Sequence, residues 1–438
     1  MGQLRLMQFP KIKFQSIPIL LSLFITFFVI YKSYNLAQHV KIAEIFLPFW
    51  IYIFPILFFF LLLLPVFYFI YQKLQSNLVL KLNIVKLSIA FVLLVVLFVL
   101  IKSLLTKTIN ISEIPTAILV LTFRILITYL YLAFHSIVWF LAGHKLINLL
   151  KLNKTLTYQI RVMLSLVLGL LIFTFGLLAL SLLKILAGLP ILILLITMLI
   201  LGIDQFQQLK NLIESKITIS KNTSLNIPMV LIITITCLQA IISFSILLSP
   251  APMAYDSLSY YFNLAKELSF SAQFIKGQYS MPIELLYASG FSLTKFLGLS
   301  NITELIVMHW TWWAGMFGFI SIYYLGKKLA NNYVGILAGA SYLTMPLVGF
   351  YMSVEPKSEI FVIPIFALSL LLFFEWIKLN NDKILFLISL LLGFVFTIKM
   401  THLFGVVAFG IATIIYAIWI KRWLKMFKII VFGIVGVI

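Results

Sequence analysis

Charged residues are scarce in this chain of 438 residues. Asp, Glu, Lys and Arg together make up 10% of it, whereas hydrophobic residues make up 63%. Soluble globular domains contain about 25% charged and about 45–50% apolar residues. The composition therefore excludes an ordinary soluble protein and indicates one that lies in a membrane.

Cysteine is almost absent, because Cys237 is the single one. One thiol excludes a disulfide within the chain and a metal site built on several thiolates. The sequence also lacks a glycine-rich phosphate loop and a dinucleotide-binding fingerprint in a polar setting. Nothing in it therefore predicts a soluble nucleotide-binding domain.

Acidic residues are few: 12 against 32 Lys and Arg, which gives a formal net charge of +20. In a soluble protein this excess would indicate a nucleic-acid partner. Here the basic residues gather in short loops between apolar runs, where orientation during membrane insertion requires them. We therefore expect no nucleic-acid partner.

Long apolar runs recur along the whole chain, and each is long enough to cross roughly 30 Å of hydrocarbon as a helix. Backbone polar groups must be satisfied within a segment that faces lipid, so these runs must be helices. The predicted fold class is all-α, a polytopic integral membrane protein with about 12–13 transmembrane helices. The expected spans lie near residues 17–31, 46–70, 84–105, 116–142, 162–183, 187–203, 228–248, 303–325, 333–352, 358–376, 384–400, 402–420 and 427–438. The fifth and sixth could form one long or re-entrant element, since only Gly188-Leu189-Pro190 separates them.

The distribution of basic residues predicts the orientation of these spans. With the N-terminus in the cytoplasm, roughly two-thirds of Lys and Arg fall in cytoplasmic loops, as the positive-inside rule requires. The apolar run from Ile17 follows Arg5, Lys11 and Lys13 and lacks a small-residue cleavage site, which predicts a retained signal-anchor helix. The longest loop, residues 249–302, then lies outside the cytoplasm.

The sequence of that outer loop predicts an amphipathic helix along the membrane surface. Apolar residues recur there at steps of three and four, as they do on one face of a helix. A loop of this length is usually functional or disordered, and its aromatic content argues against disorder. The apolar positions are Tyr255, Leu258, Phe262, Ala265 and Leu268.

Two parts of the chain differ in character. Residues 1–225 have short loops and about six expected helices, which predicts an N-terminal transmembrane module of unknown role. Residues 226–438 contain the long outer loop and most of the acidic residues, which predicts that this part carries the site. The chain shows no internal repeat, which argues against a transporter built from duplicated halves.

The second part resembles a known family in four stretches. These are "YDSLSYYFNLAKEL", "MPIELLYASGFSLTKFLGLS" with "ELIVMHW", "MPLVGFYMSVEPKSEIFVIPIF" and "LGFVFTIKMTHLFGVV". They are similar to the outer loops and helix starts of GT-C superfamily membrane glycosyltransferases, such as protein O-mannosyltransferases and lipid A aminoarabinose transferases. The resemblance covers roughly residues 228–438.

The resemblance implies an enzyme of a bacterial inner membrane. It implies transfer of a sugar from a polyprenyl-phosphate carrier to an acceptor, which the sequence does not identify, at an extracytoplasmic active site among membrane lipids. A lipid-linked donor also fits the lack of a nucleotide-binding fingerprint. The chain departs from the family pattern at Glu355 and Glu359, where Asp is usual, and at Met400-Thr401, where Gly is usual. It also ends at Ile438 within an apolar run, so we expect the catalytic module to be incomplete at its C-terminus.

The resemblance also implies which carboxylates act. Asp256 is the candidate general base, and the assisting acids are Glu284, Glu355 and Glu359. Each position has a simpler explanation: Asp is a favoured N-cap, and acidic residues beside a proline suit the first turn of a helix. Three outer helix starts with acids in one half of the chain are nevertheless more than capping requires. Four carboxylates could hold a divalent ion such as Mg or Mn, although their spacing does not indicate one.

Basic and aromatic residues on the outer side complete the candidate site. The resemblance implies that Lys399 and His402, together with Lys357 and Tyr260, contact the lipid phosphate or the substrate. The simpler explanation is that such lysines extend from helix ends to the interface. His309, Trp310, Trp312 and Trp313 are expected to form an interfacial aromatic belt.

Two other functions compete with sugar transfer. A transporter or flippase of lipid-linked substrates would place ionisable residues in the middle of the membrane, where only Arg124 is expected. A non-catalytic scaffold that is related to the enzymes is the other alternative. Replacement of Asp256 by Asn distinguishes the two active classes, because it should abolish transfer and spare translocation.

Overall fold

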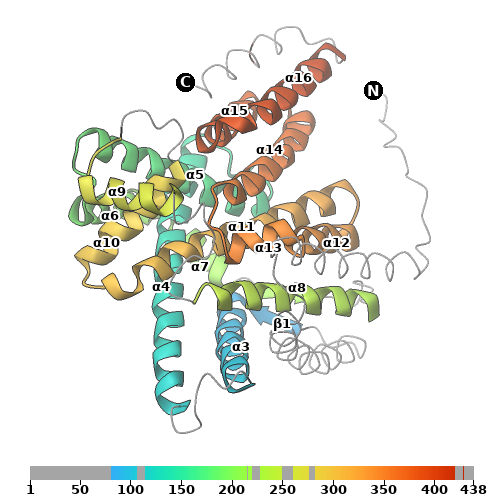
Figure 1. The fold of residues 1–438 in the computed structure, drawn as a ribbon. Helices are drawn as coiled ribbons and strands as arrows, with labels where there is room; N and C mark the ends of the chain where they lie inside the picture. The colour runs from blue at the N-terminus through green and yellow to red at the C-terminus, as the bar shows by residue number, and fades with distance from the viewer. Residues whose placement is uncertain are drawn as a thin grey trace, which may run out of the picture.

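The computed structural model describes residues 80–105, 114–214, 216–219, 227–248, 260–275, 282–419 and Lys428. Within these residues the chain forms a bundle of helices, shown in Figure 1. The expected spans near 17–31 and 46–70 lie outside the described residues, and so do Asp256 and, apart from Lys428, the expected span near 427–438.

Helices occupy each of the ten expected spans that fall within the described residues, so the prediction of an all-α membrane fold is confirmed. Among the residues that the structure describes, six helical segments are long and apolar enough to cross a membrane, or seven if one bent pair counts as a single span. The helices in chain order are α3 (Ile84–Leu105), α4 (Ile114–Leu149), α5 (Tyr158–Leu182), α6 (Gly188–Gly202), α7 (Phe206–Glu214), α8 (Ile227–Ile246), α9 (Phe262–Ser271), α10 (Pro282–Phe296), α11 (Thr303–Leu329), α12 (Asn332–Leu343), α13 (Pro346–Ser353), α14 (Glu359–Leu379), α15 (Asp382–Ile398) and α16 (Leu403–Trp419).

The region around Gly188 forms a turn between two separate helices. Helix α5 ends at Leu182 and α6 begins at Gly188. Lys184 in this turn has φ of 61°, a left-handed conformation that reverses the chain. Gly188 allows close packing there, because a Cβ at this position would lie 2.3 Å from Cβ of Phe296. The alternative of one long helix is therefore wrong.

The expected span at 333–352 is broken into α12 and α13, which meet at an angle of 60°. Pro346 is the first residue of α13. Proline cannot donate the hydrogen bond that a continuous helix needs at this point, and it restricts the residue before it to an extended backbone. Met345 accordingly has ψ of 128°.

A short antiparallel pair of strands accompanies the helices and was not expected from the sequence. Strand β1 (Leu80–Asn83) pairs with β2 (Lys216–Ile219), with Leu80 opposite Ile219. Both strands are four residues long and lie in regions of mixed polar and apolar residues. The pair brings the segment before α3 to the segment after α7.

The core of the bundle begins with the close contact of α4 and α5. A Cβ at Gly143 would lie 1.9 Å from the carbonyl oxygen of Ser165, and one at Gly169 would lie 2.0 Å from that of Trp139. Only glycine allows the two backbones to approach so closely. From this contact one continuous apolar cluster runs from Leu132 to Ala417 and includes residues of both predicted parts of the chain.

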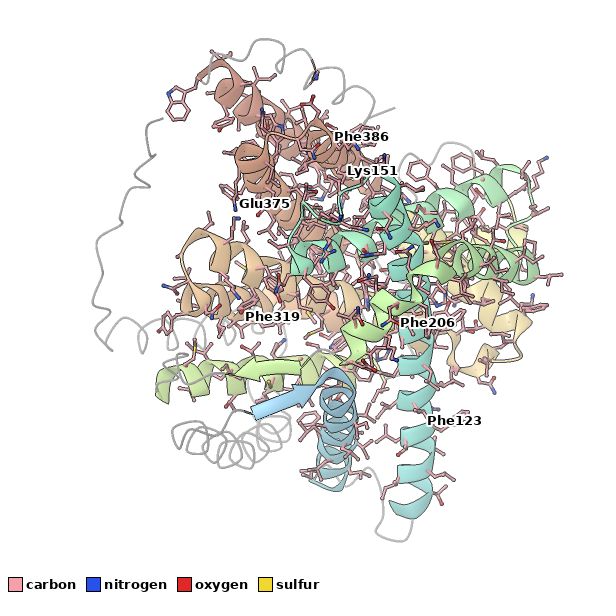
Figure 2. All side chains as sticks on the ribbon, turned by 180° about the vertical axis from the view of Figure 1, so that it is seen from behind. Phe123, Lys151, Phe206, Phe319, Glu375 and Phe386 are labelled. Atoms are coloured by element: carbon pink, nitrogen blue, oxygen red, sulfur yellow. The ribbon has the colours of Figure 1, made fainter. Side chains whose placement is uncertain are left out.

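The outer surface of several helices is apolar, as expected of a surface that faces lipid. Phe123 is 56% exposed on the part of α4 that extends away from the rest of the bundle beside α3 (Figure 2). Phe206 at the start of α7 is likewise exposed. Exposed apolar patches of this extent on a water-soluble protein would be an interaction surface or an aggregation hazard.

The expected aromatic belt at residues 309–313 is wrong for its first two members. His309 and Trp310 are wholly buried, and Trp310 stacks on Trp139 of α4 with ring centroids 4.9 Å apart. Trp312 and Trp313 are partly buried, and their indole N–H groups donate to Ala240 O and Ser136 Oγ. This end of α11 faces neighbouring helices, so its aromatic residues pack within the protein.

Contacts between loops group the helix ends in two sets. In one set Lys145 pairs with Asp204, and Lys383 Nζ donates to Leu150 O at 2.8 Å. In the other set, Leu186 N donates to Ala272 O and Ser292 Oγ donates to Leu186 O. The first set contains loops expected in the cytoplasm, and the second contains loops expected outside it. The grouping therefore agrees with the predicted alternation of the spans.

Candidate functional site

Polar side chains from three distant stretches of the chain meet at the second set of helix ends. The stretches are the starts of α9 and α10, the connection from α13 to α14, and the junction of α15 with α16. Helix α14 packs on both α11 and α15, and α10 packs on α9 and α15. These contacts bring residues around 260, 284, 355 and 400 together.

An ion pair joins Lys399 to Glu359 across the site. Glu359 lies in the first turn of α14, and Lys399 follows α15 with an extended backbone, φ −158° and ψ 122°. The ammonium group of Lys399 donates to Oε1 of Glu359. The side chains are 32% and 22% exposed, so solvent and a ligand can reach the pair.

A second pair lies in the connection from α13 to α14. Lys357 Nζ lies 3.2 Å from Oε2 of Glu355, which is 8% exposed in its side chain. The Lys357 ammonium also lies 5.4 Å from the centroid of the Tyr351 ring, within range of a cation–π contact. Tyr351 interacts electrostatically with both pairs, with Lys357, Glu359, Glu355 and Lys399. The two pairs therefore belong to one cluster.

Glu284 is the third carboxyl group of the cluster and the most buried. It lies in the first turn of α10, as the sequence predicted, but it is only 2% exposed. Its Oε2 has no hydrogen-bond partner among the described residues. Burial raises the pKa of Glu284 to about 8, with a further increase from the charge of Glu359 that its own backbone N–H and Lys399 oppose. At neutral pH this carboxyl group is therefore mainly protonated.

Tyrosines from the start of α9 and from α10 line the cluster. Tyr260 is 42% exposed, and its pKa is raised by burial and by the charge of Glu284. Tyr261 is 7% exposed and hydrogen bonded to the Ser358 side chain; its pKa is raised by burial first and then by Glu359 and Glu284. The Tyr287 hydroxyl is wholly buried, and burial and Glu284 raise its pKa as well. All three hydroxyls remain protonated hydrogen-bond donors at neutral pH.

His402 lies beside the Lys399–Glu359 pair. Its backbone N–H donates to Lys399 O at 3.0 Å within the short 3-10 turn Met400–His402, and its ring interacts electrostatically with Glu359 and Lys399. The Nε2 atom has no hydrogen-bond partner among the described residues. The ring therefore places a buried nitrogen beside the pair.

The cluster contains seven of the eight residues that the sequence singled out, and Asp256, the eighth, lies outside the described residues. Sequence reasoning missed Tyr261, Ser358 and Tyr287. Tyr261 stands in a run of tyrosines and apolar residues that gives no local sign of which ring turns inward. The seven are Tyr260, Glu284, Glu355, Lys357, Glu359, Lys399 and His402.

The amphipathic character of α9 is confirmed over the part that the structure describes. Phe262, Leu264, Ala265 and Leu268 are buried, and Lys266 is exposed. The buried face packs on α10 through Phe262 and Tyr287, whose ring centroids lie 5.8 Å apart. The helix therefore rests on protein along this face, and Tyr255 and Leu258 lie outside the described residues.

The cluster does not fit a metal ion within the described part of the chain. No group of three or more His, Cys, Asp or Glu side chains there has the arrangement of a metal site. Glu355 and Glu359 are paired with lysines, and Glu284 is buried and mainly protonated. Carboxylates that coordinate a divalent cation are ionised and turned to a common point. We therefore derive no step through a metal.

The arrangement suits an anionic ligand that exchanges protons. Two ammonium groups and the exposed Tyr260 hydroxyl offer hydrogen-bond donors to phosphate oxygens. The Glu359 carboxylate, 22% exposed in its side chain, is an acceptor that becomes available when Lys399 turns to a ligand. Both kinds of group lie at helix ends and not in the middle of the spans.

Comparison with known proteins supports the resemblance seen in the sequence. A family model described as dolichyl-phosphate-mannose-protein mannosyltransferase matches residues 290–438, which is less than half of the chain. This match confirms the predicted similarity to membrane glycosyltransferases of the GT-C type and supports an enzyme of that type. It includes the two ion pairs and His402, and it begins after Glu284. The searches of curated proteins and of solved structures each gave no match.

Proposed function

We propose that the protein is a GT-C type glycosyltransferase that moves a sugar from a polyprenyl-phosphate carrier to an acceptor at this cluster. The observation that carries the proposal is the convergence of Lys357, Lys399 and three carboxyl groups at one set of helix ends. A lipid-linked sugar phosphate needs cations for its phosphate and a base for the acceptor, and the cluster holds both.

The lysines bind the carrier phosphate in this proposal. Lys399 and Lys357 are each held by a carboxylate that a phosphate group can replace, because phosphate accepts charge-assisted hydrogen bonds from ammonium groups in the same way. Negative charge develops on the phosphate as the bond from the sugar to the phosphate oxygen breaks. The two ammonium groups and the donors of Tyr260 and His402 stabilise that charge.

A carboxylate accepts the proton of the attacking acceptor. Asp256, at the beginning of the outer loop, is the proposed general base, and Glu359 or Glu355 assists once its lysine has turned to the phosphate. The acceptor oxygen forms a bond to the sugar carbon, its proton passes to the carboxylate, and the carrier phosphate leaves. Glu284 keeps its own proton and donates a hydrogen bond from the buried side.

The location of the site is part of the same proposal. The cluster lies among loops that the lysine and arginine distribution assigns to the outer face. We propose an extracytoplasmic site in a bacterial inner membrane, with the N-terminus in the cytoplasm. In this proposal residues 1–225 form an N-terminal module, and its helix α5 packs against α10 and α14, which carry the site.

The test is a transfer assay with the purified protein in a bilayer and a polyprenyl-phosphate sugar donor. Asp256→Asn should abolish detectable transfer, and Lys399→Ala should lower its rate by about 100-fold to 1,000-fold. Lys154→Ala, at an exposed lysine of the loop after α4, is the matched control and should retain full activity. Transfer that survives Asp256→Asn unchanged would exclude Asp256 as the base, and translocation of the lipid without transfer would favour a flippase.

A further inference from the structure

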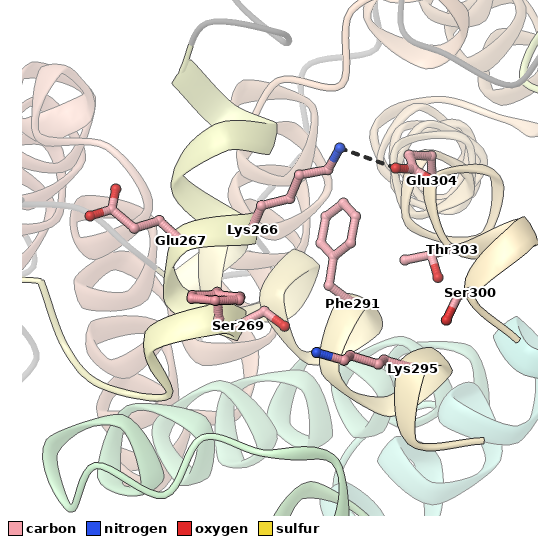
Figure 3. A pocket seen from close by; sticks show the side chains of 9 residues that line it. Lys266, Glu267, Ser269, Phe291, Lys295, Ser300, Thr303 and Glu304 are labelled. Carbon is pink, nitrogen blue, oxygen red and sulfur yellow. Dashed lines mark ion pairs between the residues drawn. The ribbon is translucent and has the colours of Figure 1, made fainter. Parts of the chain in front are cut away.

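An open pocket lies between α9, α10 and the beginning of α11, at the other end of the helix pair from the cluster. It has a volume of about 530 Å³ (Figure 3). Glu284 lies in the first turn of α10 and Lys295 in the last, and eleven residues of α-helix span about 16 Å. The pocket is therefore separate from the candidate catalytic cluster.

Two lysines and two glutamates line the pocket, so its formal charge is zero, but the charges are unevenly distributed. Lys266 Nζ lies 3.1 Å from Oε1 of Glu304, so its charge is partly compensated. Lys295 makes no ion pair with any residue that the structure describes, and its Nζ lies 5.9 Å from the centroid of the Phe270 ring. Figure 3 shows the Glu267 carboxylate directed away from the other labelled side chains. Within the described part of the chain, the ammonium group of Lys295 is therefore open to an anionic ligand.

Hydroxyl groups and an aromatic face complete the lining. Ser300 and Thr303 line the wall at the beginning of α11, where the Thr303 hydroxyl is hydrogen bonded to that of Thr294. Phe291 stands between the two lysines in Figure 3. The Lys266 ammonium lies 5.5 Å from the centroid of the Phe291 ring. Ammonium and hydroxyl donors in one hollow are the groups that bind phosphate oxygens.

The pocket lies at the level where candidate membrane spans end. The span Tyr158–Leu182 ends, and the span Gly188–Glu214 begins, on either side of the turn that contains Leu186. Leu186 N in this turn donates to Ala272 O, directly after α9. A third span begins at Ser300, in the pocket wall. The ends of spans lie at the lipid headgroups, so the pocket opens at headgroup depth.

Large exposed apolar side chains lie in the pocket lining and directly after Lys295 in the chain. Phe270 in the lining is 89% exposed, and Phe296 and Leu297, which follow Lys295, are each 50% exposed. Exposed apolar residues beside lysines at the ends of membrane spans are typical of a surface that contacts lipid chains and headgroups together. A small soluble anion would not contact these exposed apolar side chains, whereas the chains of a lipid would.

We propose that the pocket is a binding site for the phosphate headgroup of an anionic membrane lipid. Lys295 and Lys266 bind the phosphate, Ser300 donates to its oxygens, and the lipid chains lie against Phe270 and Phe296. The site holds a lipid whether or not the cluster transfers sugar, so it does not depend on the proposed function.

The experiment is native mass spectrometry of the full chain released from bilayers of phosphatidylcholine with phosphatidylglycerol. Wild-type protein should retain phosphatidylglycerol, and Lys295→Gln should weaken its apparent affinity about tenfold, as the loss of one charge-assisted contact predicts. Lys295→Arg should restore it, and Lys154→Gln is the matched control. Unchanged unfolding temperatures exclude misfolding of these exposed variants.

A second arm distinguishes the lipid from a free phosphate ester. Phe270→Ser should weaken retention of phosphatidylglycerol, and soluble glycerol phosphate should not displace the lipid at equal concentration. Retention that is the same in wild type, Lys295→Gln and the Lys266→Gln/Lys295→Gln double variant would overturn the proposal. Displacement by glycerol phosphate at equal concentration would overturn the assignment to a lipid.

Discussion

At one end of α14, Lys328 pairs with Glu375, whereas at the other end three carboxyl groups share two lysines. The Lys328–Glu375 pair has an N–O distance of 2.6 Å, and the carboxylate is almost wholly buried. At the other end Lys357 and Lys399 pair with Glu355 and Glu359, and Glu284 has no lysine of its own among the described residues. Both ends are built from the same types of residue in the same helix bundle.

The difference lies in the number of acids and in how open the pairs are. A one-to-one pair with a buried carboxylate stabilises a helix contact, and breaking it leaves an uncompensated charge. A surplus carboxyl group that must hold a proton is costly for stability, and perturbed groups of this kind concentrate at functional sites. The comparison therefore separates a structural ion pair from a candidate reaction site, and variants at the two ends can test that separation.

The largest expected effect comes from removing a lysine at each end and measuring sugar transfer. Lys399→Ala should lower the transfer rate by about 100-fold to 1,000-fold, the usual loss when one group that stabilises a developing charge is removed. Lys328→Ala should change the rate by less than about threefold, since Lys328 lies on α11 beside the end of α14 that is far from the cluster. Equal losses in both variants would show that the two pairs have the same role.

The same two variants should rank in the opposite order when the free energy of unfolding is measured instead of the transfer rate. Lys328→Ala leaves the Glu375 carboxylate buried without its partner, and we expect it to lower the free energy of unfolding by about 3 kcal/mol. Lys399→Ala removes a more exposed pair and should cost less than about 1 kcal/mol. Thermal unfolding in a fixed detergent measures both, and a larger loss for Lys399→Ala would contradict the distinction.

The raised pKa of Glu284 predicts that the stability of the protein depends on pH. Its pKa rises from 4.5 to about 8 in the folded protein, so the folded state binds more protons between these values. The stability from this group is complete below pH 4.5 and is lost as the pH rises through about 8, by at most about 1.4 kcal/mol per pH unit. Glu284→Gln, which keeps a neutral side chain, should therefore flatten the fall in unfolding temperature between about pH 5 and pH 8. A fall that is equally steep in this variant would show that another group causes it.

A change at the neighbouring acid should give a smaller effect on the same profile. The negative charge of Glu359 raises the pKa of Glu284, and the positive charge of Lys399 lowers it. Glu359→Gln removes the first charge and frees the second, and both changes lower the pKa of Glu284. The pH at which the unfolding temperature stops falling should therefore be lower in Glu359→Gln. Glu267→Gln, on the exposed side of α9, should leave this pH unchanged. An end point that moves to higher pH in Glu359→Gln would contradict the proximity of the two acids.

Much of the site could be predicted because its residues occupy helix starts. Glu284 and Glu359 follow prolines or a polar turn, and their positions in first helical turns are confirmed. The pairing of Lys399 with Glu359 could not be predicted, since it joins residues 40 apart in the chain and depends on how α14 and α15 pack. The burial of Glu284 likewise depends on α9 and α10 together.

The fold, too, could be predicted from the sequence only where its features are local. Apolar runs identified the helices, because a span of hydrocarbon requires length and composition that are local properties. The burial of His309 and Trp310 was missed, since a tryptophan near a helix end has the same local sequence whether it faces lipid or a neighbouring helix. The β1–β2 pair was missed because each strand is four residues long and pairs with a strand more than a hundred residues away.

The most direct test of the central claim is the binding of polyprenyl phosphate to the purified protein, measured by native mass spectrometry. Wild-type protein and Lys328→Ala should bind it with the same affinity, and Lys399→Ala should bind it at least about tenfold more weakly. Asp256→Asn should bind it as well as wild type does, because a base for the acceptor does not hold the phosphate. Well-folded wild-type protein that binds no polyprenyl phosphate, or Lys399→Ala that binds it as tightly as wild type, would contradict the account.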